Sequence, residues 1–313
     1  MQSRLIQGQN FYAKPFLKWV GGKGQLLKEI ENRLPHIVTN NELEYYFEPF
    51  IGAGSVFFHL KNNYKIKKSI ISDINPELIL TYNVIKKDYK KLIKELKPLK
   101  KEYWDCEDDP EKQKNVYLKN RASFNENLNK IDFDTYDKTH IKRAAQTIFL
   151  NKTCFNGMFR VNKEGKFNVP AGRYKNPSIY DEDNLQEVHN VLNDNVIIKT
   201  QDFSKTEKYI KEKSFVYLDP PYRPLNKTSQ FTQYYKENFG DLDQIRLSEY
   251  IKRLTKKNIP IMLSNSDSKN KENKSYFKKL YPNQTIEPVK ARRNINANGK
   301  KRNAINELII KNY

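Results

Sequence analysis

The sequence predicts an α/β fold: an open, mainly parallel sheet interrupted by an inserted module. Residues 1–83 and 196–313 alternate strand and helix signals, whereas residues 84–195 are first helical and charged and then turn into a hairpin. Strand, helix and strand at this spacing are typical of βαβ units, which build parallel sheets. A chain of 313 residues is long enough for such a sheet with an insert, or for two domains.

The first stretch opens with a predicted helix over residues 24–34, which Pro35 ends. A strand signal at residues 45–47, a helix with an apolar face, and a strand signal at residues 70–71 that ends at Asp73 follow. The apolar positions that indicate the two helices are Leu26, Leu27, Ile30, Leu34, Val56, Phe57 and Leu60. The strands and the helix between them make one βαβ unit.

The remaining elements complete this pattern. Two short strand-like runs within residues 159–169 meet around Gly165 and predict a β-hairpin. Strand signals return at residues 196–198, 215–218, 260–263 and 308–310. An amphipathic helix before the third of these carries Leu242, Ile245, Leu247, Ile251 and Leu254. Residues 1–83 and 196–313 are therefore predicted to form one domain, into which residues 84–195 are inserted.

The charge balance favours a polyanionic partner. The 57 Lys and Arg against 37 Asp and Glu give a net charge of +20 and a pI near 9.6. Hydrophobic residues at 37% and aromatic residues at 12% exclude a disordered basic tail protein. A nucleic acid suits this excess of positive charge better than a small acidic substrate does, although a lysine-rich host composition would produce the same charge.

Several other classes of protein are disfavoured. Cys106 and Cys154 form no Cys-x-x-Cys pair and the four histidines are scattered, so we expect neither a metal site nor a disulfide framework. No apolar run approaches the roughly 20 residues that span a bilayer. The first ten residues also lack the apolar region of a secretion signal. We therefore expect a soluble, cytoplasmic protein with no membrane partner.

The strongest chemical signal is Asp219-Pro-Pro-Tyr222, which follows the strand predicted at residues 215–218. Ligands of parallel sheets bind at the carboxyl ends of the strands. Pro220 and Pro221 stiffen the turn and lack N–H groups, so Asp219 and nearby carbonyls are left as acceptors. These acceptors suit an adenine N6 amino group, and Tyr222 offers a face for stacking an extruded base. In isolation the tetrapeptide could be a plain turn; its aromatic residue after a buried strand favours chemistry.

A glycine turn, Glu48-Pro-Phe-Ile-Gly-Ala-Gly54, lies between the first predicted strand and its helix. Phe57 stands where a dinucleotide fingerprint needs its third glycine, so that motif fails. S-adenosylmethionine has no pyrophosphate but still needs a tight turn beneath its methionine moiety. Asp73, 19 residues beyond Gly54, could accept both ribose hydroxyls at the end of the next strand. The turn and this carboxylate together indicate a nucleoside site.

A second glycine loop, Phe16-Leu-Lys-Trp-Val-Gly-Gly-Lys23, precedes the first helix. It lacks the glycine spacing and the Gly-Lys-Ser/Thr ending of a phosphate loop, which excludes that interpretation. Lys23 could instead neutralise the carboxylate of a methionine group, and Trp19 could pack on the ligand.

Five motifs, in chain order, resemble those of the Dam and Dpn-type (D12 class) DNA adenine-N6 methyltransferases: Lys18-Trp-Val-Gly-Gly-Lys23, Glu48-Pro-Phe-Ile-Gly-Ala-Gly54, Ser72-Asp-Ile-Asn75, Gln201-Asp-Phe203 and Asp219-Pro-Pro-Tyr222. The resemblance covers nearly the whole chain, because residues 155–160 and 167–174 are similar to the recognition hairpin of that family. It implies a Rossmann-like S-adenosylmethionine-dependent methyltransferase sheet with an inserted helical and β-hairpin target-recognition domain.

The resemblance also implies roles for particular residues. Catalysis would involve Asp219, Pro220 and Tyr222. S-adenosylmethionine would be bound by Trp19, Lys23, Glu48, Phe50, Gly52, Gly54, Asp73, Asp202, Phe203 and Asp219. Double-stranded DNA would be contacted by Lys18, Phe155, Asn156, Arg160, Pro170, Arg173 and Tyr174. No metal is implied, since methyl transfer from a sulfonium needs neither a metal nor a strong general base.

Three residues of the DNA-binding group have more specific implied roles. Lys18 and Arg160 match positions that read guanines in G-A-T-C sites, and Phe155 matches an aromatic residue that wedges beside the flipped base. Arginine is suited to bidentate contact with guanine O6 and N7. Phe155, Met158 and Ala171 stand where relatives can carry other residues, which affects the wedge rather than the target class.

Two features outside these motifs have both a functional and a structural interpretation. Phe231 could hold the flipped adenine against Tyr222, or it could belong to the core. The basic loop from Lys290 to Arg302 could contact phosphates or face solvent, and the overall charge slightly favours phosphate.

The sequence therefore predicts transfer of a methyl group from S-adenosylmethionine to adenine N6 in double-stranded DNA, at G-A-T-C, by base flipping. One alternative is methylation of another amino group, in RNA, at cytosine N4 or on a protein glutamine. The aspartate of Asp219-Pro-Pro-Tyr222 and the DNA-like insert argue against it. The other alternative is a basic DNA-binding protein that has lost catalysis.

Overall fold

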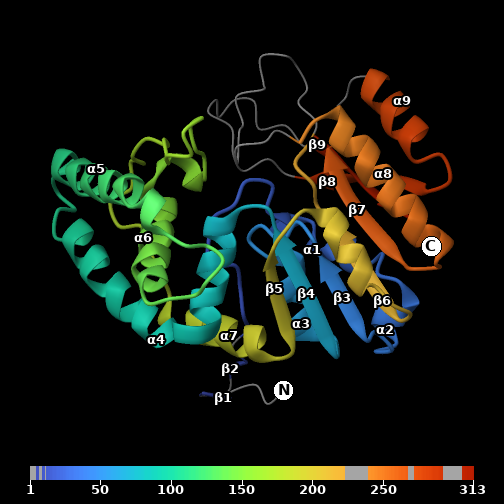
Figure 1. Cartoon of the computed structure of the whole chain (residues 1–313), viewed down its shortest axis with the longest axis horizontal. Helices are drawn as coiled ribbons and strands as arrows, with labels where there is room; N and C mark the ends of the chain where they lie inside the picture. The colour runs from blue at the N-terminus through green and yellow to red at the C-terminus, as the bar shows by residue number, and fades with distance from the viewer. Residues whose placement is uncertain (1–4, 7–8, 11, 223–238, 267–270, 292–304) are drawn as a thin grey trace.

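The structure is a computed structural model that describes residues 5–6, 9–10, 12–222, 239–266, 271–291 and 305–313. A seven-stranded sheet lies beside a helical module (Figure 1). The strands are β1 (Leu5–Ile6), β2 (Gln9–Asn10), β3 (Tyr45–Glu48), β4 (Lys68–Asp73), β5 (Val196–Thr200), β6 (Ser214–Leu218), β7 (Ile261–Ser266), β8 (Thr285–Ala291) and β9 (Ile305–Lys311). The α-helices are α1 (Leu27–Glu31), α2 (His36–Thr39), α3 (Ser55–Asn63), α4 (Pro76–Trp104), α5 (Pro110–Glu126), α6 (Thr139–Thr153), α7 (Glu182–Asn193), α8 (Asp241–Lys256) and α9 (Lys271–Leu280). Short 3₁₀ helices are η1 (Lys23–Gln25), η2 (Leu128–Lys130), η3 (Phe155–Gly157) and η4 (Phe203–Tyr209).

The strand order of the large sheet is β5-β4-β3-β6-β7-β9-β8. The first five strands in this order are parallel, and β9 pairs antiparallel with both β7 and β8. Phe47 of β3 lies opposite Ile70 of β4 and Val216 of β6, in the middle of the sheet. The predicted open, mainly parallel sheet is confirmed. Because β9 is antiparallel, its first residues lie at the edge where the parallel strands end.

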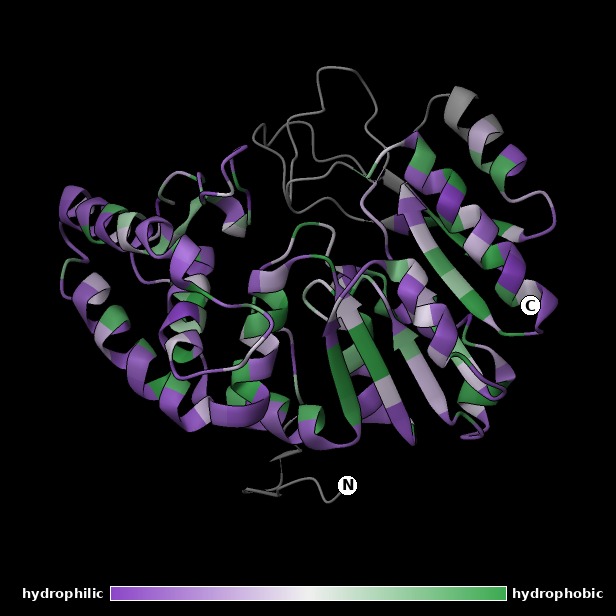
Figure 2. Cartoon of the chain, viewed as in Figure 1, coloured by the Kyte–Doolittle hydropathy of each residue, from purple (hydrophilic) through white to green (hydrophobic). Residues whose placement is uncertain are grey.

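Successive strand residues alternate between two hydrophobic cores, because side chains along a strand point to opposite faces. In β4, Ile71 belongs to the core that α3 and α4 cover, whereas Ile70 belongs to the core under α8 and α9. Phe215 and Val216 of β6 divide in the same way. The banded helices in Figure 2 fit this arrangement, with green stripes of hydrophobic residues between purple ones. Burial of both faces explains why these strands are continuous apolar runs in the sequence.

The helical module shares the first of these cores. Helix α4 continues past residue 84, where the insert was predicted to begin, and its backbone leaves helical geometry only at Asp88. It packs against α6 and α7. Leu96 and Phe149 of the module are fully buried in the same cluster as Ile71 of the sheet. The division between residues 1–83 and 84–195 stays a prediction.

Two predicted helices differ from the structure in extent or in facing. Instead of one helix over residues 24–34, η1 precedes a short α1, as expected from the low helix propensity of Gly24. In α8, Leu242 and Ile245 are exposed, although they were expected on the apolar face. The buried face of this helix is formed by Gln244, Leu247, Tyr250, Ile251 and Leu254.

Neither α9 nor β8 was predicted from the sequence. Helix α9 is rich in lysine, and β8 contains Pro288, which normally argues against a strand. Strand β8 is at the end of the sheet order, and a proline is tolerated in an edge strand because one side of it needs no ladder bonds.

Candidate functional site

Four carboxylates lie at one edge of the sheet. Glu48 and Asp73 end β3 and β4, and Asp219 follows the last residue of β6. Glu307 comes from the antiparallel β9, where it pairs with Ser266 at the end of β7. Strand ends thus bring together acidic groups that are far apart in the sequence.

Asp219 forms an ion pair with Lys23, whose Nζ lies 2.6 Å from Oδ1. Lys23 is buried, with 3% of its side chain exposed, and it also donates to the Gly21 carbonyl oxygen at 2.6 Å. Burial raises the pKa of Asp219 to about 6, and the charge of Glu307 adds to this, whereas Lys23 opposes it. The lysine was expected to face a ligand carboxylate, and in the structure it faces this aspartate.

Tyr222 lies against the same ion pair. Its hydroxyl donates to Glu307 Oε2 at 2.6 Å, and Lys23 Nζ lies 4.8 Å from its ring centroid. Burial and then the charges of Asp219 and Glu307 raise the pKa of Tyr222 well above its usual value, so the phenol stays protonated. Pro220 is buried at this turn. We call Lys23, Asp219, Pro220, Tyr222 and Glu307 the acidic corner.

Glu48 lies deeper than the acidic corner and is buried. The Tyr46 hydroxyl donates to its Oε2 at 2.5 Å. Burial, with the nearby charge of Asp219, raises the pKa of Glu48 well above its usual value.

The glycine turn after β3 depends on the absence of side chains at two positions. Gly52 and Gly54 both have positive φ, 45° and 74°. A Cβ at Gly52 would lie 2.9 Å from Cδ1 of Trp19, and one at Gly54 would lie 2.7 Å from the Tyr82 hydroxyl. Trp19, which was expected to pack on a ligand, therefore closes over this turn.

Asp73 fits the binding of a ribose. The Gly52 N–H donates to Oδ2 at 3.2 Å and the Asn75 N–H donates to Oδ1 at 3.0 Å. Each oxygen thereby keeps acceptor capacity for a hydroxyl group. Burial raises the pKa of Asp73 to about 6, against the effect of these N–H groups.

An aromatic cluster borders the turn. Phe50 stacks on Phe203 with ring centroids 5.4 Å apart, and the guanidinium of Arg246 lies 5.1 Å from the Phe203 ring. Asp202 caps η4 by accepting from the Ser204 N–H at 3.0 Å, and it pairs with Arg246 at 2.9 Å. With Asp73 and the glycine turn, these residues fit an adenosine better than a phosphate-rich ligand, since Asp73 and Asp202 are both acidic.

The predicted hairpin is held differently from the sheet. The chain turns at Gly165 with a φ of 79°, and Val161 pairs with Phe167 in an isolated antiparallel bridge. The two runs on either side, expected as short strands, form no longer ladder than this. We call residues 154–174 the hairpin segment.

Asn151 fixes the backbone of Lys18 against this segment. Its side chain accepts from the Lys18 N–H and donates to the Lys18 carbonyl oxygen, both at 2.8 Å, and it also donates to the Gly157 carbonyl oxygen at 2.9 Å. Lys18 is exposed, and its Nζ lies 4.4 Å from the Tyr174 ring centroid. Asn156 and Gly157 both have positive φ, and a Cβ at Gly157 would lie 2.4 Å from Lys18 Cβ.

The other predicted DNA contacts also lie on the hairpin segment. Arg160 Nε donates to Asn168 Oδ1 at 2.8 Å, which fixes the direction of the guanidinium. Phe155 is 43% exposed, unusual for a phenylalanine, and its N–H donates to the Pro170 carbonyl oxygen at 2.9 Å. Pro170 and Arg173 are exposed.

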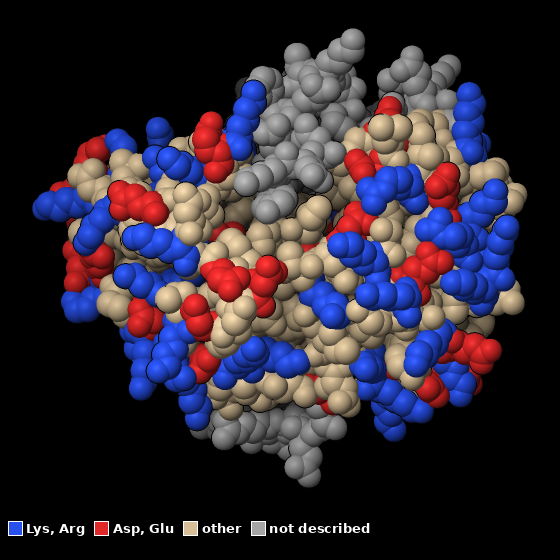
Figure 3. Space-filling model, viewed as in Figure 1, with Lys and Arg blue, Asp and Glu red and all other residues tan. Residues whose placement is uncertain are grey.

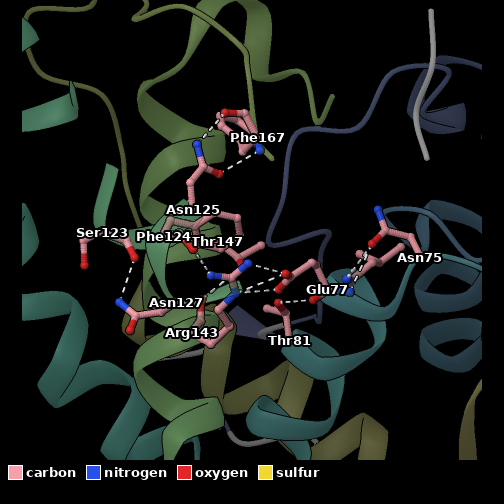
Figure 4. Close-up of polar contacts among 11 residues, drawn as sticks. Asn75, Glu77, Thr81, Ser123, Phe124, Asn125, Asn127, Arg143, Thr147 and Phe167 are labelled. Atoms are coloured by element: carbon pink, nitrogen blue, oxygen red, sulfur yellow. Dashed lines mark hydrogen bonds and ion pairs between the residues drawn. The ribbon is translucent and has the colours of Figure 1, made fainter. Parts of the chain in front are cut away.

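A buried polar network supports the hairpin segment (Figure 4). Asn125 of α5 accepts from the Phe167 N–H at 2.8 Å and donates to the Phe167 carbonyl oxygen at 3.0 Å, so its amide replaces a strand partner. Arg143 of α6 donates to the carbonyl oxygen of Phe124 and pairs with both oxygens of Glu77. Glu77 lies in the first turn of α4, shortly after Asp73. The network thus links the hairpin segment with the carboxyl end of β4.

Three supporting residues were missed by the sequence analysis. Glu307 gave no signal because the direction of β9 was unknown. An acidic residue before the apolar run at residues 308–310 would have indicated the site if β9 had been taken as antiparallel. Asn125 and Asn151 act on the backbone of distant segments, and a single asparagine on a predicted helix indicates no such contact.

Some residues with a predicted role lie outside the described residues. They are Phe231 and the basic residues 292–302. In the part of the chain that the structure describes, no group of three or more His, Cys, Asp or Glu could hold a metal ion. None of the helices described there combines the length and the apolar composition that crossing a membrane requires.

The positive charge is distributed over the molecule. On the face seen in Figure 3, Lys and Arg side chains cover both the helical module and the sheet half, with Asp and Glu between them. Although the net charge is +20, the Lys and Arg side chains form no single stripe on this face.

Comparison with known proteins gives consistent matches over nearly the full length. A family described as D12 class N6 adenine-specific DNA methyltransferase matches residues 19–295. The chain is 50% identical over 301 residues to the Type II methyltransferase M.MjaIII of Methanocaldococcus jannaschii, covering 96% of this chain and 99% of that protein. It is 37% identical over 310 residues to the Type II methyltransferase M1.LlaDCHI of Lactococcus lactis subsp. cremoris, covering 99% of each. It is 31% identical over 296 residues to the DNA adenine methylase of Escherichia coli K12, covering 95% and 94%.

Proposed function

The chain belongs to the D12 class of N6 adenine-specific DNA methyltransferases, and from this premise we propose that it methylates adenine within G-A-T-C sites of double-stranded DNA after the base has left the duplex. The observation that carries this proposal is the acidic corner. It combines a carboxylate acceptor, an aromatic face and a buried cation within a few ångströms of one another.

Asp219 receives the target amino group in this proposal. Lys23 engages Oδ1, and a carboxylate has acceptor sites on both oxygens, so Asp219 can still accept from an N6 proton. That hydrogen bond turns the nitrogen lone pair toward the methyl group. Extruding the base costs on the order of a few kcal/mol, which stacking on Tyr222 and the bond to Asp219 offset.

The residues at the ends of β3 and β4 hold the methyl donor. S-adenosylmethionine, when bound, supplies an electrophilic methyl group. Asp73 accepts the ribose hydroxyls, and the Gly52 turn allows close approach of the backbone. Phe50 and Phe203 border the adenine of the donor. Catalysis is then mainly positioning, because the nitrogen, the methyl carbon and the sulfur must lie in line.

The hairpin segment reads the DNA sequence in this proposal. Arg160, oriented by Asn168, contacts one guanine, and Lys18, fixed by Asn151, contacts the other. Phe155 is exposed enough to enter the space that the extruded base leaves. Pro170, Arg173 and Tyr174 position the backbone of the duplex.

The test uses DNA from a methylation-free host that expresses the chain. Digestion with nucleases that differ in sensitivity to adenine methylation at G-A-T-C should show complete protection at that site. Protection at other sequences instead would overturn the G-A-T-C assignment.

A purified variant tests the acidic corner. Asp219→Ala should lower turnover by roughly 1,000-fold, because the amino group loses its acceptor in the transition state. Asp108→Ala, the same substitution at a side chain that is 83% exposed, is the matched control and should leave turnover unchanged. Near-normal methylation by Asp219→Ala would contradict the proposed role.

A further inference from the structure

The acidic corner contains a carboxylate that the proposed chemistry does not use. Glu307 reaches it from β9, the strand that runs against the direction of the others. Its Oε2 accepts the Tyr222 hydroxyl at 2.6 Å and lies 4.0 Å from Lys23 Nζ. One oxygen thus contacts both the aromatic residue and the cation that flank Asp219.

The hydrogen bond to Glu307 restrains the ring of Tyr222. A tyrosine side chain has two rotatable bonds before the ring, and a bond at the far end of the ring fixes its plane. Because the phenol stays protonated, it donates to Glu307 at all working pH values. Lys23 lies over one face of the ring, 4.8 Å from its centroid, so the opposite face is the one left for a base.

Glu307 also lies close to Lys23 and acts on the charge of Asp219. The lysine lies between two carboxylates, 2.6 Å from Asp219 and 4.0 Å from Glu307. Two charged groups act on Asp219, namely Lys23 and Glu307, of which Glu307 raises and Lys23 lowers its pKa. The charge of Asp219 in turn raises the pKa of the other titratable groups that face it, Glu48, Tyr217 and Tyr222.

We propose that Glu307 is a positioning residue for methyl transfer, which fixes the plane of the Tyr222 ring for the target adenine and holds Lys23 at Asp219. This inference rests on the proposed function, in which Tyr222 stacks on the base. If Glu307 served only the fold, its side chain would be needed to hold β9 in the sheet. The pairing of Glu307 with Ser266 and Val289 is made by the backbone, so substitutions of the side chain leave the ladder intact.

Glu307→Ala and Glu307→Gln separate the effect of the hydrogen bond to Tyr222 from the effect of the negative charge. The alanine removes both the acceptor and the charge, and kcat should fall roughly 10- to 100-fold, as expected for a hydrogen bond to a charged group. The glutamine keeps an acceptor oxygen for Tyr222 and removes the charge, so it should retain most of kcat. Both variants should shift the acid limb of the kcat profile to lower pH, since Asp219 loses a neighbouring negative charge.

Tyr222→Phe provides the partner for a double-mutant cycle. It keeps the ring and removes the hydroxyl, so it should match the loss in Glu307→Ala, and the double variant should lose little more than either single one. A fluorescent adenine analogue at the target position reports stacking, and its quenching should weaken in Glu307→Ala and in Tyr222→Phe. Additive losses, or unchanged quenching in both variants, would overturn the positioning role.

Glu287→Gln is the matched control. Glu287 lies on β8, opposite Ile309, and pairs with Arg33 and Lys311 away from the acidic corner. This variant should keep kcat and the acid limb of the wild type. The unmodified enzyme, assayed alongside, separates the two hypotheses: absence of adenine methylation at G-A-T-C defeats the proposed function. Full methylation by the unmodified enzyme, together with an unaltered kcat in the Glu307 variants, defeats this inference alone.

Discussion

The acidic corner and the hairpin segment are positioned by different kinds of bonds. The corner lies at the ends of β6 and β9, whose backbones are fixed by continuous ladders on both sides. The hairpin segment has two isolated bridges, Val161 to Phe167 and Cys154 to Ala171, and otherwise depends on side-chain amides that bind its backbone. Asn125 and Asn151 supply those amides.

This difference follows from what each region has to do. Methyl transfer requires atoms in line, and a sheet edge holds its side chains more rigidly than a loop does. A segment that contacts the surface of a duplex must follow the shape of the DNA, and amide contacts at a few backbone positions leave it that freedom. In the proposed function, the chemistry that needs fixed geometry and the reading of the DNA sequence thus belong to two differently held regions of one chain.

The largest effect is expected where the two regions are joined. Arg143→Met keeps an apolar stem beside Phe124 but leaves the buried Glu77 without its cation, and breaking a buried pair in this way costs about 3–5 kcal/mol of unfolding free energy. Denaturant unfolding measures the loss. Removal of the exposed pair Lys97–Glu182 by Lys97→Met is the matched control, with an expected cost below about 1 kcal/mol.

The outcome for Arg143→Met bears on the comparison. If the hairpin segment depends on this network, the variant should also lose discrimination between G-A-T-C and altered sites at a temperature where it is still folded. Stability within about 1 kcal/mol of the wild type would contradict a supporting role for the pair.

The two regions also differ in how well the sequence predicted them. The carboxyl ends of β3, β4 and β6 were predicted because buried parallel strands are apolar runs, and the acidic residue that follows each run marks the edge. Gly52 lies against Trp19 and donates to Asp73 there, and Asp219 follows β6, which pairs with the other side of β3.

What sequence reasoning missed depends on tertiary contacts. The direction of β9 depends on its pairing with β7, so the arrival of Glu307 at Tyr222 left no local pattern. Lys23 was expected to face a ligand, but a buried lysine needs an anion, and Asp219 was the nearest one. Leu242 was assigned to the core from periodicity alone, although it lies on the exposed side of α8.

A smaller effect is expected from the hairpin segment alone. Arg160→Ala removes a guanidinium that Asn168 orients, and it should cost about 1–3 kcal/mol of discrimination at one guanine. Ratios of kcat/KM for duplexes that differ only at that base pair measure the effect. Lys163→Ala, at an exposed lysine of the same turn, is the control and should weaken all sequences equally. An equal loss on every duplex in Arg160→Ala would count against base reading.

A change of pH should affect methyl transfer at the sheet edge and leave the reading of DNA by the hairpin segment unchanged. The pKa values of Asp73 and Asp219 are both about 6, raised mainly by burial, and both residues are strong acceptors only when ionised. The ratio kcat/KM for the methyl donor should therefore fall below pH 6, by about tenfold per pH unit for each of the two groups. Discrimination between duplexes should stay constant from pH 5 to 7, because Asp73 ends β4, Asp219 follows β6, and both lie outside the hairpin segment.

The effect of acid on stability through these two groups should have the opposite sign to its effect on turnover. A carboxyl whose pKa is raised in the folded state binds its proton more tightly there than in the unfolded chain, so stability falls as pH rises through this window. Between the usual value near 4 and the folded value near 6, lowering the pH therefore stabilises the fold through Asp73 and Asp219 while it lowers turnover. A melting temperature measured across the same pH range, in Asp73→Asn and the wild type, tests this: the substitution should remove most of the Asp73 contribution to the slope. A slope that is unchanged in the variant would show that burial of Asp73 does not set its titration.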